Sequence, residues 1–304
     1  MKILVTGATG FVGRVIVRQL LAKGEQVVVL TRNVTKAALV LGSQCEYFQW
    51  RAVTDGAPLE AFNGVDSIIN LMGEGIADHN WTPDQKKRIY DSRIEGTRRL
   101  VEACKALGDK APKALVSTSA VGIYGNRQDE EIIEGTTLAS DFLGQLCQDW
   151  ETEARQAEKF NMRVAIIRVG VVLGRGGALA KMLPIFKLGA GGPLGEGKQW
   201  MSWVHVEDLA GMFVRAARED EFHGIYNGTA PYPVVNKDFT KTLGKVLKRP
   251  TVLPAPTFAI KFAFGERAQV LLEGQRVIPK RLHDEAHFHY RYPTLEMALK
   301  ETAY

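Results

Sequence analysis

The stretch that indicates the fold is TGATGFVG, residues 6–13. It follows a short β-rich run, KILVT, and leads into FVGRVIVRQLLAKG, where apolar residues recur at helical spacing. Between a strand and a helix, Gly7 permits a tight turn, Gly10 lets a pyrophosphate approach the backbone, and Gly13 lets the helix pack closely on the strand. The helix N-terminus offers free amides to phosphate. The stretch therefore predicts a dinucleotide site formed by Gly7, Thr9, Gly10, Phe11, Val12 and Gly13.

Short apolar runs alternate with helical stretches through the rest of the first half. The long stretch 82–107 begins with Thr82-Pro83, an N-cap followed by proline at the first helical position. Near-continuous apolar strands separated by helices favour a parallel sheet covered on both faces. With right-handed crossovers this is an α/β fold, a doubly wound Rossmann sheet. Its further strands are expected at 26–31, 67–72, 114–119 and 164–170.

The composition of the sequence changes after about Gly170. Residues 174–203 are rich in glycine and contain two prolines, which favours a helix followed by ordered loops over a ligand cleft. We expect a Rossmann domain at 1–170, with 201–220 returning to it, and a smaller C-terminal α/β substrate domain at 171–304. The stretch 257–282 is expected to be an amphipathic helical tail.

Composition narrows the classes of function. The chain has 304 residues, is 45% hydrophobic and 24% charged, and carries a net charge of +5, as a soluble globular protein does. No apolar run reaches membrane-spanning length, and the basic groupings are too short for a nucleic-acid surface. We therefore expect no membrane span and no nucleic-acid partner. A protein partner stays open, as does the oligomeric state.

Cysteine and histidine usage gives no sign of a metal site. Cys45, Cys104 and Cys147 lack metal-ligand spacing, which fits a reducing compartment. HDEAHFHY, 283–290, lacks the order of a zinc-protease motif, so no metal is expected. Because MKILVTG begins the fold at once, a cytoplasmic location is expected, or the plastid stroma if a presequence has been removed.

The end of the second expected strand predicts which cofactor binds. NAD sites usually place an acid there for the ribose 2′-hydroxyl, whereas a 2′-phosphate needs a cation. This strand ends in Leu30-Thr31-Arg32, without an acid, and Arg32 can hold a phosphate bidentately. We therefore predict NADP(H) rather than NAD(H). At the same sheet edge, Leu71, Met72, Gly73 and Glu74 are expected on the adenosine and ribose side.

Several motifs together carry a family resemblance. These are the TGxxGxxG loop, STSAVGIYG at 117–125, NLMGEGIAD at 70–78, WVHVEDLA at 203–210, YNGTAPYPV at 226–234 and LLEGQRVIPKRL at 271–282. The chain resembles the atypical extended short-chain dehydrogenases/reductases, the NAD-dependent epimerase/dehydratase-like family with its own C-terminal domain of unknown function. The resemblance implies a Rossmann fold, NADP(H) binding and an unknown small-molecule substrate. Cyanobacterial and plastid members often bear the label of cell-division inhibitor.

The resemblance also assigns residues, and here the sequence departs from the pattern. Ser119 matches the superfamily's catalytic serine, and Arg93, in SRIEGT, stands where relatives usually have asparagine. Val172 is also expected to be one of the residues that bind the cofactor. The usual Tyr-x-x-x-Lys, however, has no counterpart in FLGQLCQDWE at 142–151: one alignment gives Leu143 and Cys147, and a shift by one gives Phe142 and Leu146.

Without the tyrosine and lysine, few residues of the chain are candidates for the catalytic acid. Tyr124 is the best substitute acid, although a pocket-wall or core tyrosine is the commoner situation. Asp141 is more simply a helix cap. Three functions remain open. One is an NADP-dependent oxidoreductase or epimerase, another an NADP-binding regulatory protein linked to cell or plastid division, and the last, far behind, a nucleic-acid binder.

Overall fold

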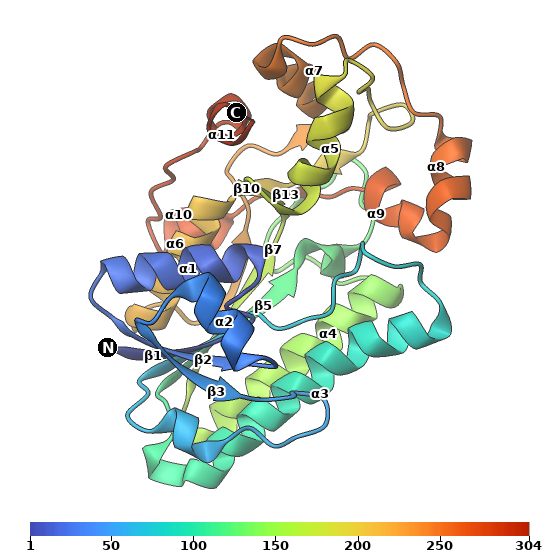
Figure 1. Ribbon diagram of the computed structural model, residues 1–304. Helices are drawn as coiled ribbons and strands as arrows, with labels where there is room; N and C mark the ends of the chain where they lie inside the picture. Colours follow the sequence, from blue (N-terminus) through green and yellow to red (C-terminus); the bar gives the residue numbers. More distant parts are fainter. Residues whose placement is uncertain (304) are drawn as a thin grey trace.

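A seven-stranded, wholly parallel sheet forms the centre of the computed structural model, which describes residues 1–303 (Figure 1). The strand order is β11-β7-β5-β4-β1-β2-β3, so the direction of winding reverses between β1 and β4. Ligands of such sheets bind outside the carboxyl ends of the strands at this reversal. The strands are β1 (Lys2–Thr6), β2 (Gln26–Thr31), β3 (Cys45–Gln49), β4 (Ser67–Asn70), β5 (Ala114–Ala120), β7 (Arg163–Val169) and β11 (Gly224–Gly228).

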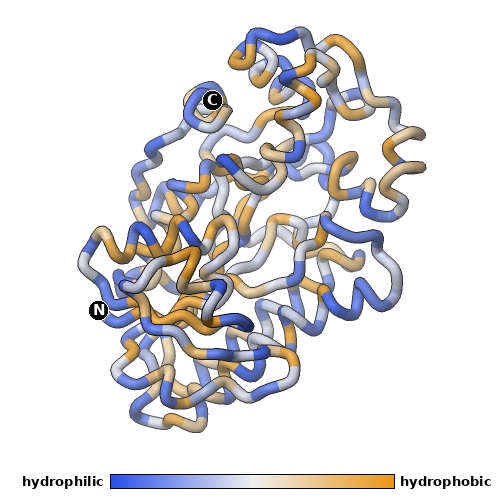
Figure 2. Tube along the Cα trace, viewed as in Figure 1, coloured by the Kyte–Doolittle hydropathy of each residue, from blue (hydrophilic) through white to orange (hydrophobic). Residues whose placement is uncertain are grey.

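Apolar side chains alternate between the two faces of the sheet and are buried on both. Ile3 and Val5 of β1 point to one face and Leu4 to the other, and all three are fully buried. Continuous apolar strands of this kind need helices on both sides. The hydropathy colouring accordingly concentrates apolar residues along the central strands (Figure 2).

Two pairs of long helices cover those faces. Helices α1 and α6 pack against each other on the face of Ile3, whereas α3 and α4 lie together on the face of Leu4. Thr82 caps α3 by accepting a hydrogen bond from the Gln85 amide, with proline next to it as expected. The helices are α1 (Phe11–Ala22), α3 (Pro83–Leu107), α4 (Phe142–Arg155) and α6 (Val206–Arg218), with the shorter α2 (Val34–Leu41) following β2.

A smaller C-terminal region packs around its own apolar cluster, which includes Phe186, Trp203, Phe239 and Leu299. Helices α5 (Gly177–Lys187), α7 (Asn236–Leu247) and α11 (Leu295–Thr302) contribute to this cluster, and α8 (Thr257–Phe264) and α9 (Gln269–Leu272) lie between α7 and α11 in the chain. The short α10 (Lys280–Asp284) packs on β11 instead, and its Leu282 belongs to the core of the main sheet. Three short strand pairs lie outside the main sheet: β8 (Val171–Leu173) with β10 (Trp203–His205), β9 (Trp200–Met201) with β12 (Val234–Val235), and β6 (Glu131–Ile132) with β13 (Arg276–Val277). The last pair joins a segment before Gly170 to the C-terminal part of the chain.

The structure differs from the expectation in three places. The sequence does not predict β3, because only Cys45 of CEYFQ is buried and the apolar pattern is weak. The expected helical tail 257–282 is broken into α8, α9, β13 and α10, since Gly265, Gly274 and Pro279 interrupt it. β11 extends the main sheet, although its residues lie in the range expected for the second domain. No helix in the described part of the chain is long and apolar enough to cross a membrane.

Candidate functional site

A cavity of about 550 Å³ lies at the carboxyl edge of the sheet, where β1, β2 and β4 end. Nine expected cofactor residues line it, from the glycine loop, the end of β2 and the segment after β4: Gly7, Thr9, Gly10, Thr31, Arg32, Leu71, Met72, Gly73 and Glu74. The rest of the wall is formed by residues that the sequence alone does not indicate: Thr6, Ala8, Leu30, Trp50, Arg51, Ala52, Val53, Thr54 and Ser92.

The cavity floor is fixed by buried side chains at the strand ends. The Thr6 hydroxyl donates to Asn70 Oδ1 at 2.7 Å and accepts from the Leu71 amide at 3.1 Å. Asn70 Nδ2 donates to Thr97 of α3 at 3.0 Å, and Trp150 Nε1 of α4 donates to the same hydroxyl at 3.0 Å. These hydrogen bonds hold the cavity floor to α3 and α4.

The glycine loop has the shape of a phosphate cradle. Gly7 has φ of +67°, and a Cβ there would lie 2.8 Å from the Leu71 carbonyl oxygen, so only glycine fits. A Cβ on Gly13 would lie 2.3 Å from the Gly7 carbonyl oxygen, which explains the close approach of α1 to the loop. Gly10 precedes α1 with no side-chain cap, leaving the first helical amides free for an anion. These residues fit a bound pyrophosphate.

The second group of lining residues, 50–54, follows β3. Trp50 is buried, and its amide donates to the Thr31 carbonyl at 2.8 Å, so this turn lies beside the end of β2. Residues 50–54 follow the carboxyl end of a parallel strand, as Arg32 does, so they lie at the same edge of the sheet. Sequence reasoning missed the turn because it missed β3; the run EYFQW was the available signal.

Five expected cofactor residues are not among the residues that line the cavity. The Phe11 ring packs against Gly174 and Gly176, where an added Cβ would come within 2.5 Å and 2.6 Å of ring carbons. Arg93 Nη1 donates to the Glu74 carbonyl at 2.9 Å, and its guanidinium lies over the Trp150 ring at 5.1 Å. Burial lowers the pKa of Arg93. The remaining three are Val12, Gly13 and Val172.

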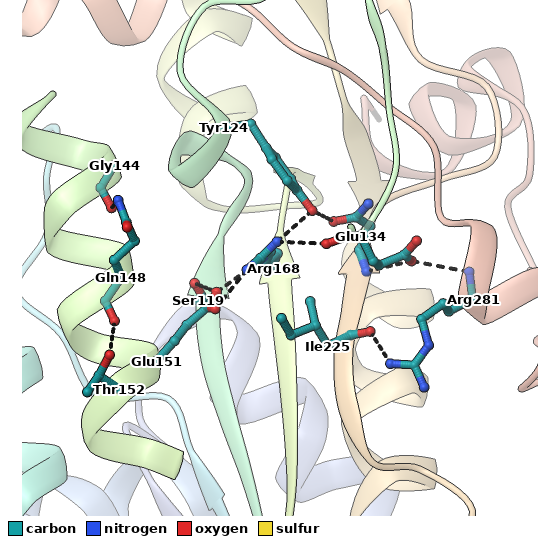
Figure 3. Close-up of polar contacts among 11 residues, drawn as sticks. Ser119, Tyr124, Glu134, Gly144, Gln148, Glu151, Thr152, Arg168, Ile225 and Arg281 are labelled. Carbon is teal, nitrogen blue, oxygen red and sulfur yellow. Dashed lines mark hydrogen bonds and ion pairs between the residues drawn. The ribbon is translucent and has the colours of Figure 1, made fainter. Parts of the chain in front are cut away.

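Ser119 belongs to a buried polar network rather than to the cavity wall (Figure 3). Its hydroxyl donates to Glu151 Oε1 at 2.7 Å. The same carboxylate accepts from Arg168 Nε at 2.7 Å and Nη2 at 2.8 Å. Ser119 is 1% exposed. As long as its proton is directed to Glu151, the Ser119 hydroxyl acts as an acceptor toward any other group.

Tyr124 continues this network and has no exposed surface. Its hydroxyl accepts from Arg168 Nη1 at 2.9 Å and donates to Asn227 Oδ1 at 2.7 Å. Burial raises the pKa of Tyr124, although Arg168 opposes the rise. The Asn227 amide donates to Glu134 Oε1 at 3.1 Å, and the Arg281 amide donates to that oxygen at 3.2 Å, so the network extends to α10.

The first turns of α4 lie where the missing tyrosine and lysine are expected. Asp141 caps the helix by accepting from the Gly144 amide at 2.8 Å. Leu143 lies next to Gly122, and the Cys147 thiol lies beside Ser119 and the backbone of Ala120. Phe142 packs its ring against Trp81 and Leu146 lies in the same apolar cluster, which Leu143 also contacts from its other side, whereas no contact of Phe142 or Leu146 with Ser119 or Gly122 is present among the described residues. The geometry thus favours the alignment with Leu143 and Cys147.

Neither residue can replace the usual proton relay in its present form. Cys147 is buried, and burial raises the pKa of its thiol to about 11, so it is neutral near pH 7. Leucine has no ionisable group. The site therefore offers a dinucleotide cavity, while the α4 face at Leu143 and Cys147 carries neither an acid nor a cation.

Comparison with known proteins identifies the family. The model of the NAD dependent epimerase/dehydratase family matches residues 3–227, and a domain of unknown function (DUF1731) matches 255–302. The chain is 40% identical over 309 residues to the chloroplastic epimerase family protein SDR39U1 homolog of Arabidopsis thaliana, covering 99% of this chain and 86% of that one. It is 38% identical over 303 residues to the epimerase family protein YfhF of Bacillus subtilis, covering 99% and 97%.

A solved structure resembles the whole chain. The crystal structure of human epimerase family protein SDR39U1 with NADPH superposes with a TM-score of 0.89 at 35% identity, covering 100% of this chain and 99% of that one. The glycine loop, the seven-stranded parallel sheet and the C-terminal segment are all included in this overlap. The chain therefore belongs to the NAD-dependent epimerase/dehydratase family.

Proposed function

We propose that this chain binds NADP(H) in the cavity at the sheet edge and acts as an epimerase- or oxidoreductase-like protein on an unknown small molecule. The observation that carries the proposal is the cavity wall at the end of β2, where Arg32 follows Thr31 and no acid is present. A 2′-phosphate requires such a cation, whereas a free ribose hydroxyl would be matched by an acid. The human relative solved with NADPH supports the same choice.

The residues of the cavity wall also indicate which parts of the cofactor they contact. We propose that Thr9 and Gly10 meet the pyrophosphate, with Phe11, Val12 and Gly13 holding the first turn of α1 beneath it. Thr31 and the segment Leu71, Met72, Gly73 and Glu74 would surround the adenosine and its ribose. Arg93 and Val172 are proposed to support the nicotinamide side from behind the wall. The bound cofactor would supply hydride transfer.

The chemistry of this chain's own residues is proposed to be limited. Ser119 and Tyr124 remain the candidate catalytic groups, but both hydroxyls already donate within the buried network. The Leu143 and Cys147 face would make the nicotinamide pocket drier and leave it without the usual proton donor. We therefore expect weak or absent turnover of ordinary short-chain dehydrogenase substrates, with NADPH binding retained.

Calorimetric titration with NADPH and NADH tests the binding half of this proposal, and tighter NADPH binding is expected. NADPH oxidation with a panel of sugars and ketones tests the catalytic half. Any activity should fall in Ser119→Ala and, to a smaller extent, in Tyr124→Phe, while Cys147→Ser should retain it. Loss of a robust activity in Cys147→Ser alone would show that α4 carries the chemistry and would refute this assignment.

The absent tyrosine and lysine also favour a second candidate, an NADP-binding regulatory protein whose partner recognises the cofactor-bound form. The cell- or plastid-division role implied by the resemblance belongs to this candidate. It requires tight NADP(H) binding without turnover of any tested substrate. Turnover that Ser119→Ala abolishes would exclude it.

A further inference from the structure

Arg32 and Arg51 line the same cavity, and neither side chain has a partner in the part of the chain that the structure describes. Arg32 and Arg51 both line the wall and are both exposed. Among residues 1–303, neither side chain makes an ion pair, a hydrogen bond or an aromatic contact, although most arginines of the chain do. Two unpaired cations on one wall indicate a ligand that carries more than one negative charge.

Strand pairing places the backbone of these two arginines at neighbouring strand ends. Strands β2 and β3 are parallel neighbours with Thr31 opposite Gln49, and Trp50 continues the pairing by donating to Thr31. Arg32 therefore stands one residue beyond β2, and Arg51 stands two residues beyond β3. Because adjacent strands are only about 5 Å apart, both guanidiniums can reach one phosphate group.

The turn that carries Arg51 is held firmly although its side chain is free. The Arg51 carbonyl accepts from the amides of Thr54 at 3.0 Å and Asp55 at 2.9 Å. The buried Trp50 ring holds the same turn, because its Nε1 donates to the Asp55 carbonyl at 3.0 Å. An ordered backbone with an unpaired cation loses little entropy when an anion binds.

We propose that Arg51 is the second arm of a clamp that, with Arg32, binds the phosphate monoester on the adenosine ribose of NADP(H). This inference rests on the proposed function and assigns part of its cofactor specificity to a turn outside the glycine loop and β2. A phosphate monoester carries nearly two negative charges near pH 7 and three acceptor oxygens, which matches two guanidinium forks.

The test is calorimetric titration of NADPH, NADH and adenosine 2′,5′-bisphosphate into five proteins: wild type, Arg51→Gln, Arg51→Lys, Arg32→Gln and Arg249→Gln. Arg249 is the matched control, since it is exposed and forms no side-chain contact in the described residues but lies outside the cavity wall. Both wall arginines are exposed, so these variants should fold, and equal thermal melts check this.

Arg51→Gln is expected to weaken NADPH and the bisphosphate by about tenfold each, with NADH binding unchanged and Arg249→Gln equal to wild type. Arg51→Lys should recover only part of the loss, because an ammonium lacks the planar fork. Wild-type affinity for NADPH in Arg51→Gln would overturn the inference, as would an equal loss for NADPH and NADH. If wild type prefers NADPH and only Arg32→Gln weakens it, the proposed function stands and the clamp does not. If wild type shows no preference, the proposed function fails.

Discussion

Arg168 on β7 and Glu151 on α4 form a bidentate ion pair inside the protein, with Nε and Nη2 donating to the two carboxylate oxygens at 2.7 and 2.8 Å. The side chains are 2% and 7% exposed. The pair joins the central sheet to the helix that lacks the usual catalytic residues, and it holds Ser119 through the same carboxylate. The hydroxyl expected to meet substrate is thereby directed into the protein.

Breaking this pair from one side should be costly. Arg168→Met leaves Glu151 buried without its partner, and a loss of about 3–5 kcal/mol in the free energy of unfolding is expected. Replacing both residues by apolar ones should recover part of that loss. Urea denaturation followed by circular dichroism measures both. Lys198→Met, which removes an exposed pair with Glu196, should leave the midpoint unchanged. A midpoint for Arg168→Met equal to wild type would contradict the stabilising role.

Arg32→Glu should reverse or abolish the preference for NADP(H). A carboxylate at the end of β2 repels a 2′-phosphate and can accept hydrogen bonds from free ribose hydroxyls. The measurement is the ratio of dissociation constants for NADPH and NADH, which should fall by at least about tenfold. Equal affinities of the wild type for the two cofactors would defeat this prediction at the outset.

Two glycines of the loop should respond differently to valine. A Cβ on Gly10 would lie 3.2 Å from the Gly7 carbonyl oxygen and the backbone there is extended, so Gly10→Val should block pyrophosphate and change the thermal melt little. A Cβ on Gly13 would lie 2.3 Å from that oxygen, so Gly13→Val should destabilise the fold itself. Thermal melts with and without NADPH separate the two effects. Tight NADPH binding by Gly10→Val would remove the assignment of the cavity.

Restoring the usual pair in α4 should need a third change. Cys147 is buried, and the positive charge of Arg93 acts on its thiol. The double variant Leu143→Tyr, Cys147→Lys therefore puts an ammonium close to a guanidinium. We expect that double variant to melt lower than wild type and to show no reductase activity. Adding Arg93→Asn removes the competing charge and should recover the melting temperature. Reductase activity in the double variant alone would show that Arg93 does not interfere.

His205 should make stability depend on pH. It is 2% exposed, its Nδ1 accepts from the Glu207 amide at 3.2 Å, and burial lowers its pKa from 6.5 to about 4. The unfolded chain therefore binds a proton at higher pH than the folded one. The stabilisation is present above about pH 6.5 and is lost as pH falls toward 4.

The change to test is His205→Asn, which retains a side-chain acceptor for the helix cap. Over pH 6.5 to 4 the wild type should lose more free energy of unfolding than this variant, by on the order of 2–3 kcal/mol. Parallel slopes for the two proteins across that interval would show that His205 does not titrate on unfolding.

The glycine spacing and the run of apolar strands were enough to predict the fold, because local sequence sets both. Gly7 needs its positive φ wherever it stands, and strands as apolar as β1 and β4 can only lie in a sheet covered on both faces. The carboxyl-edge rule then placed Arg32 and the segment 71–74 on one cavity without any knowledge of distances.

Only the tertiary structure decided what surrounds Ser119 and Tyr124. Glu151, Arg168 and Asn227 are far apart in sequence, and their ion pair and hydrogen bonds depend on α4 packing against β5 and β7 and on β11 pairing with β7. Likewise, Arg51 joined the cavity wall through β3, a strand whose half-exposed residues carry little apolar pattern. Local sequence determines the backbone and the burial of each segment, but the partner of a polar side chain is set by which segments the folded chain brings together.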